Sequence, residues 1–153
     1  MVGALVSSGC LGEIDVATPV DAGPSALSGT YAFTTVDYMF HETSPGDSWR
    51  SDVEPDRVTI STGYSGLLLV HRSAVGCTLR ADRVSDTSAR LESGQTCQIG
   101  VTGALYTLTL TTGTVNIEGV TLSAEYHWTY VLDLGGGMTR RGTLTEAGQG
   151  SRQ

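Results

Sequence analysis

The segment from Leu105 to Leu132 constrains the fold of this chain most strongly, because apolar residues occupy every second position along most of it. Gly113 and Gly119 divide the segment into three runs. A period of two places successive side chains on opposite faces of a β-strand, so each run has one buried and one solvated face. The segment therefore predicts an antiparallel meander, and by itself it indicates no chemistry.

The rest of the 153-residue chain continues this pattern, with short alternating runs between turn-forming residues. No stretch has helical periodicity. The polar, acidic segment 42–56 is expected to be a loop, and 147–153 a frayed tail. The predicted strands are 29–40, with a bulge near Thr34–Thr35, then 57–62, 67–71, 77–84, 89–92, 96–101, 105–112, 114–118, 120–133 and 139–145.

These eight to ten short strands predict an all-β fold, an antiparallel up-and-down meander that closes into a barrel over residues 28–146. Sequential hairpins with short connections can close a sheet and so remove its unpaired edges. A β-sandwich is the alternative, because it has the same strand spacing.

The charge balance excludes some partners. The formal net charge is −7, and all nine basic residues are arginine. Nucleic-acid binding depends on cationic side chains that neutralise phosphates, so we expect no nucleic-acid partner. Adsorption to anionic lipid is disfavoured for the same reason. No run of about 18–20 apolar residues is present, as a membrane-spanning helix requires.

The N-terminal residues indicate where the protein is targeted rather than how it folds. The residues Val6, Ser7, Ser8 and Gly9 before Cys10 resemble the end of a bacterial lipoprotein signal peptide, although Ser7 stands where that family usually has Leu. No basic region precedes them, and the apolar run is short. A true start upstream of Met1 would reconcile these departures; an ordinary N-terminal segment with a stray cysteine is the alternative.

The resemblance implies that 1–9 are a signal-peptide remnant, that Cys10 is lipidated, and that the protein is a lipoprotein of the cell envelope, at the outer membrane or facing the periplasm. Residues 10–27 contain two prolines, small residues and acids without periodicity, which is typical of an extended tether. Contact with the membrane is then expected through the lipid anchor only.

With Cys10 committed to lipid, Cys77 and Cys97 remain, and they suit one disulfide in an oxidising compartment. Two buried free thiols are the alternative. A metal site is not expected, because His41, His71 and His127 lie on separate segments without a second His nearby. The acids Asp47, Asp52, Glu54 and Asp56 lack the order of a calcium loop and are interpreted as a solvated loop.

No nucleophile, phosphate-binding or dinucleotide motif is present: Gly63-Tyr-Ser-Gly66 is not a nucleophile elbow, and Gly135–Gly137 is a turn. The chain is therefore not expected to be an enzyme or to carry a cofactor. The most suggestive feature is the ladder Tyr126, Trp128 and Tyr130, which points to one side of one strand. It is either plain core or, with Tyr106, the wall of a ligand-binding barrel.

Gly29-Thr30-Tyr31, followed by a meander and by Arg140-Arg141 on the last predicted strand, resembles the lipocalin pattern. That family begins with Gly-x-Trp and packs an arginine of its final strand across the ring. Here Tyr31 replaces the Trp, and Arg140 or Arg141 would supply the arginine. The chain also resembles small lipocalin-like domains of bacterial lipoproteins through Leu27–Tyr31, Cys77–Leu79 and Gly94–Cys97.

The resemblance implies a β-barrel and supports the fold more than a function. The leading hypothesis is that the barrel binds a small apolar or amphipathic ligand. The candidate ligand-binding residues are Tyr31, Tyr106, Tyr126, Trp128 and Tyr130. The alternative is a structural or protein-interaction envelope domain with a solid core, whose protein partner the sequence does not identify. A void of ligand size near Tyr106, Tyr126, Trp128 and Tyr130 would separate the two.

Overall fold

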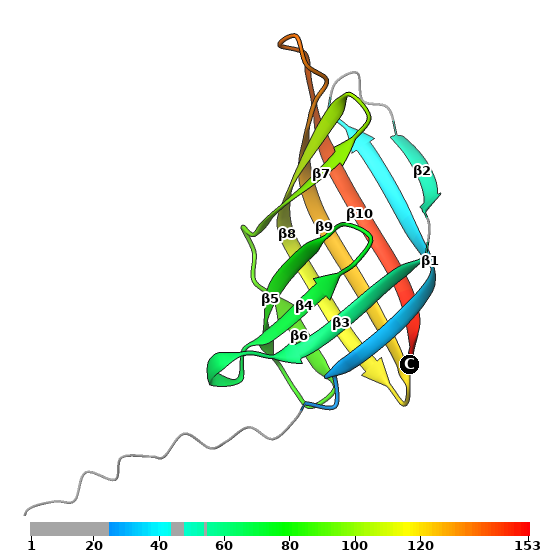
Figure 1. The fold of residues 1–153 in the computed structure, drawn as a ribbon, viewed down its shortest axis with the longest axis vertical. Helices are drawn as coiled ribbons and strands as arrows, with labels where there is room; N and C mark the ends of the chain where they lie inside the picture. The colour runs from blue at the N-terminus through cyan, green and yellow to red at the C-terminus, as the bar shows by residue number, and fades with distance from the viewer. Residues whose placement is uncertain (1–24, 44–47, 54) are drawn as a thin grey trace, which may run out of the picture.

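The computed structural model describes residues 25–43, 48–53 and 55–153, and these form ten antiparallel β-strands and one turn of 3-10 helix (Figure 1). The elements are β1 (Gly29–Glu42), β2 (Ser48–Val53), β3 (Asp56–Thr62), η1 (Tyr64–Gly66), β4 (Leu68–Arg72), β5 (Cys77–Arg83), β6 (Ser88–Leu91), β7 (Thr96–Val101), β8 (Ala104–Glu118), β9 (Thr121–Asp133) and β10 (Thr139–Arg152).

The sheet closes on itself. Its strand order is β10-β9-β8-β6-β5-β4-β3-β1, and β1 then pairs with β10 along most of its length. Neighbours in space are mostly neighbours in sequence, because tight turns join them. The closed up-and-down barrel is confirmed, and the sandwich alternative is excluded.

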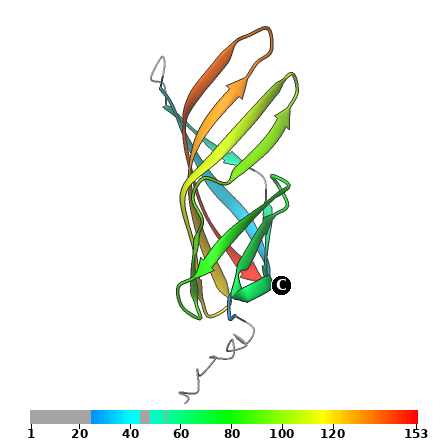
Figure 2. The same cartoon turned by 90° about the vertical axis from the view of Figure 1, so that its left-hand side faces the viewer.

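The barrel has two unlike halves along its axis. In the half that we call the closed half, β3, β4, β5 and β6 complete the wall between β1 and β8. Toward the other end, β1 pairs with β2 and β8 pairs with β7, and no pairing joins β2 to β7 in the described chain. We call this end the open half. Figure 2 shows the β4–β5 hairpin stopping short of the β7–β8 and β9–β10 hairpin ends.

Glycines on the inner face of β10 allow bulky rings to pack inside the barrel. A Cβ built on Gly150 would overlap the ring of Phe33, and one on Gly142 would overlap the Tyr130 ring and the His41 carbonyl oxygen. Because a glycine has no side chain, the neighbouring strand can place its ring against the backbone there. Because glycine stands at these inward positions, β10 shows a weaker alternation of apolar and polar residues than the other long strands.

The structure corrects three predicted boundaries and confirms the predicted bulge. The register shifts between Phe33 and Val36 of β1, as expected near Thr34–Thr35. The predicted tail is wrong, because residues 147–152 belong to β10 and pair with β1 and β9. The predicted strands 105–112 and 114–118 are one strand, β8, that passes through Gly113. The expected loop 42–56 contains β2, and Asp56 begins β3.

Candidate functional site

An apolar pocket of about 230 Å³ lies on the inner face of the open half, above the tip of the β4–β5 hairpin. Its wall combines five parts of the fold: β1, the turn after β4, β7, β8 and β10. The lining residues are Tyr38, Phe40, Ala74, Val75, Ile99, Val101, Tyr106, Leu108, Leu144 and Glu146. Apart from the tyrosine hydroxyls and Glu146, the side chains that line the pocket are apolar. Ligand pockets typically have such a lining.

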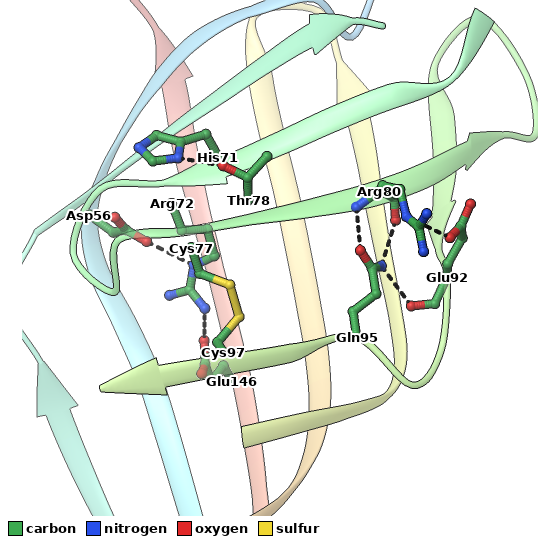
Figure 3. The surroundings of a disulfide bond; sticks show 10 residues. All are labelled: Asp56, His71, Arg72, Cys77, Thr78, Arg80, Glu92, Gln95, Cys97 and Glu146. Carbon is green, nitrogen blue, oxygen red and sulfur yellow. Dashed lines mark hydrogen bonds and ion pairs between the residues drawn. A yellow bond between two sulfur atoms is a disulfide. The ribbon is translucent and has the colours of Figure 1, made fainter. Parts of the chain in front are cut away.

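A disulfide fixes one side of this pocket. Cys77 begins β5 and Cys97 lies on β7, with 5.8 Å between their Cα atoms. The bond ties the short hairpin that contributes Ala74 and Val75 to the strand that contributes Ile99 and Val101. Figure 3 shows it beside Arg72 and Glu146. The predicted pairing is confirmed.

A buried charged cluster lies against the inner end of the pocket. Arg72 of β4 donates from Nε to Asp56 Oδ2 at 2.9 Å and from Nη1 to Glu146 Oε2. Its Nη2 donates to the Tyr38 hydroxyl at 3.3 Å, and its guanidinium lies 4.7 Å from the centre of the Tyr126 ring. Arg72 of β4 therefore contacts side chains of four other strands, β1, β3, β9 and β10, inside the barrel.

The two carboxylates of this cluster are unequally satisfied. Asp56 Oδ1 accepts the backbone N–H groups of Arg57 and Ala74, each at 2.8 Å, and a weaker bond from the Ser73 hydroxyl. Glu146 Oε2 accepts a hydrogen bond from Arg72, and Glu146 Oε1 has no hydrogen-bond partner among the described residues. The Trp128 side chain favours the charged form of Glu146, although its indole N–H lies outside hydrogen-bond geometry.

The environment of Glu146 disfavours its charge. Burial raises the pKa of this carboxyl above its ordinary value, and Arg72 only partly offsets the effect. The cluster contains two carboxylates and one guanidinium, so full ionisation leaves one uncompensated negative charge inside the barrel. A proton on Glu146, or a positive group beside it, would remove that excess.

The aromatic ladder belongs mainly to the packed interior. Tyr126, Trp128 and Tyr130 are 3%, 1% and 2% exposed, and none of them lines the pocket. The rings of Tyr126 and Trp128 stack with centroids 6.1 Å apart. Their polar atoms, and the Tyr130 hydroxyl, have no hydrogen-bond partner in the described part of the chain. Burial, opposed by Arg72, raises the pKa of Tyr126.

Tyr106 is the one member of the predicted ligand set that lines the pocket. Its ring contacts those of Phe40 and Tyr130, at centroid distances of 6.4 and 5.8 Å. Burial and the Glu42 carboxylate raise the pKa of Tyr130 to about 12, so its hydroxyl stays neutral over the physiological range. The Tyr106 ring in the pocket wall is therefore packed against two other aromatic rings.

Tyr31 lies at the other end of the barrel, far along β1 from Phe40. It is fully buried, its hydroxyl donates to the Leu27 carbonyl at 2.8 Å, and Arg152 lies over its ring at 5.4 Å. The predicted stacking of a last-strand arginine on this ring occurs, but Arg152 supplies it rather than Arg140 or Arg141. Leu27, assigned to the tether by the sequence, is part of the core.

The remaining predictions have mixed outcomes. Cys10 and the lipoprotein-like residues before it lie outside the described residues, as do Asp47 and Glu54. Asp56 is not part of a solvated loop, because its carboxylate is buried against Arg72. Within 25–43, 48–53 and 55–153, no group of three His, Cys, Asp or Glu side chains is arranged to hold a metal ion.

The sequence does not indicate that Arg72, Glu146 and Val75 shape the site. Glu146 lies at the edge of the predicted tail and Arg72 just after a short predicted strand, where charged residues are normally solvated. One sequence signal was available. Glu146 lies two residues after Leu144, so the alternation of β10 places both side chains on the same inward face.

Comparison with known proteins found no matching family model, no matching curated protein and no matching solved structure. Among the described residues, no helix is long and apolar enough to cross a membrane.

Proposed function

We propose that this protein binds a small apolar or amphipathic ligand in the pocket of the open half. The supporting observation is the pocket itself, which is apolar, is walled by five parts of the fold and is fixed on one side by a disulfide. Wall residues such as Leu108 and Leu144 are buried, so a ligand there would replace water against a fixed apolar surface.

The volume limits the ligand. A cavity of about 150 Å³ accommodates benzene, so about 230 Å³ suits one aromatic ring with a short substituent, or a short alkyl chain. Pockets for drug-sized ligands measure about 300–1,000 Å³. A long-chain fatty acid or a retinoid is therefore a poorer fit than a single-ring compound.

Calorimetric titration with benzyl alcohol tests this function. Ala74→Trp should abolish binding, because Ala74 is exposed at the pocket wall and a ring there can fill the pocket. Ala147→Trp is the matched control, since Ala147 is exposed on the outer face of β10 and should leave binding unchanged. Equal binding by both variants would contradict the pocket assignment.

We also propose that the chain is a lipid-anchored envelope protein of lipocalin-like type. The support is the lipoprotein-like sequence at Cys10, the Cys77–Cys97 disulfide, which persists in oxidising compartments, and the arginine stacked on Tyr31. Expression in a bacterium with labelled palmitate should label the wild type and not Cys10→Ser. Labelling of neither protein would contradict the anchor.

A further inference from the structure

Glu146 is the one charged residue among those that line the apolar pocket, and its side chain is fully buried there. Among the described residues, its Oε1 lacks a hydrogen-bond partner, whereas Asp56 Oδ1 in the same cluster accepts three. Leaving a buried acceptor unsatisfied is energetically costly. Such an atom beside a cavity is explained when a ligand completes its coordination.

We propose that the ligand carries a protonated amine, and that this group pairs with Glu146 Oε1 while the ligand's apolar part fills the pocket. The inference rests on the proposed function, since it assigns the ligand's head group. The remaining charges of the site fit a cation. Arg72 supplies one positive charge against Asp56 and Glu146, so one bound cation brings the cluster to neutrality.

The groups that face Glu146 from neighbouring strands reinforce this choice. They are Arg72 of β4, Asp56 of β3, Tyr38 of β1, and Tyr126 and Trp128 of β9. Of these, Arg72 is engaged with Asp56 and Tyr38 as well as with Glu146. An anionic head group would be repelled by the carboxylates of Asp56 and Glu146, and the one guanidinium nearby, that of Arg72, is already paired with both. An amine would donate to Oε1, which accepts no hydrogen bond from the described residues.

Three probes of similar size separate the possibilities: benzylamine, benzyl alcohol and benzoate. The wild type at pH 7 should bind benzylamine about tenfold or more tightly than benzyl alcohol, because a hydrogen bond to a charged group exceeds a neutral one. Benzoate should bind more weakly than both. Glu146→Gln should bring the affinities for the amine and the alcohol to within about twofold, since the charge is removed and the pocket volume is kept.

Glu125→Gln is the matched control, because it removes the same charge from the outer face of the barrel, where Glu125 pairs with His127. It should keep the amine preference, which separates Glu146 from a general attraction by the net negative chain. Should Glu146→Gln fail to fold, the ratio of amine to alcohol affinity in the wild type remains decisive.

The outcomes separate the head group from the pocket. Equal affinities for amine and alcohol in the wild type overturn the amine inference and leave the pocket function standing. An amine preference that survives Glu146→Gln also overturns it. Failure of all three probes to bind overturns the pocket function and the head-group assignment with it.

Discussion

The two halves of this barrel are built from the same long strands, but the interior of the closed half is packed and that of the open half contains a pocket. In the closed half, four short strands complete the wall, and side chains such as Leu79 and Leu122 are fully buried with their neighbours. In the open half, the β4–β5 hairpin ends early and leaves a pocket. The length of one hairpin thus decides where the solid core gives way to the apolar pocket.

The charged cluster marks the boundary between the halves. Its members come from β1, β3, β4 and β10, and its Glu146 is shared with the pocket wall. A buried ion pair is weak evidence for added stability, but the loss of one partner is costly. The predictions below therefore begin at this boundary.

Arg72→Met should destabilise the barrel most, by about 3–5 kcal/mol, because it leaves two carboxylates buried without their cation. Arg80→Met is the control: Arg80 makes a surface pair with Glu92, and its loss should cost less than about 1 kcal/mol. Urea denaturation followed by circular dichroism measures both. Similar midpoints for the two variants would mean that the cluster is not the structural link between the halves.

The double substitution Cys77→Ser, Cys97→Ser should lower the free energy of unfolding by about 3 kcal/mol, since the bond closes a loop of 20 residues. It should also weaken benzyl alcohol binding, because the bond holds β7 against the β4–β5 hairpin beside the pocket. Denaturation and calorimetry of the same sample report the two effects. Unchanged binding would show that the open half keeps its shape without the bond.

Gly150→Ala tests the packing of the closed half. The added methyl overlaps the Phe33 ring, so the variant should lose about 1–3 kcal/mol and still bind benzyl alcohol. Gly100→Ala, where the added methyl meets open space on β7, should be nearly neutral. Thermal unfolding compares them; equal melting temperatures would refute the close approach of β1 to β10.

The smallest effect is on pH dependence. Because burial raises the pKa of Glu146, the folded state holds more protons than the unfolded state between the two pKa values. The contribution of this group to stability is therefore full at low pH and is lost as the pH rises through the folded-state pKa. Glu146→Gln should flatten that part of the profile, measured by denaturation between pH 4 and 8. An identical slope in the variant would rule out Glu146 as its source.

Strict alternation made the fold predictable. The runs in 105–132 specify strands with one buried face, and the barrel follows from their number and short turns. The end of β10 was missed because Gly142, Gly148 and Gly150 replace apolar residues at inward positions. Their role becomes visible only with the Phe33 and Tyr130 rings beside them.

The pocket is less predictable from the sequence than the fold, for a physical reason. The ladder of Tyr126, Trp128 and Tyr130 has the composition of a binding surface, but its depth in the barrel makes it core. The pocket depends on where a hairpin ends relative to long strands, which is a property of pairing register and not of any local motif. The Cys77–Cys97 pairing was predictable from the hypothesis that Cys10 carries lipid, which leaves two of the three cysteines to pair.

Methyl-resolved NMR during titration with benzyl alcohol tests the contrast between the halves most directly. The account predicts shifts at Val75, Ile99, Leu108 and Leu144, and none at Leu79 or Leu122 of the closed half. Shifts centred on Leu79 and Leu122, or no shift at any methyl at saturating concentration, would contradict it.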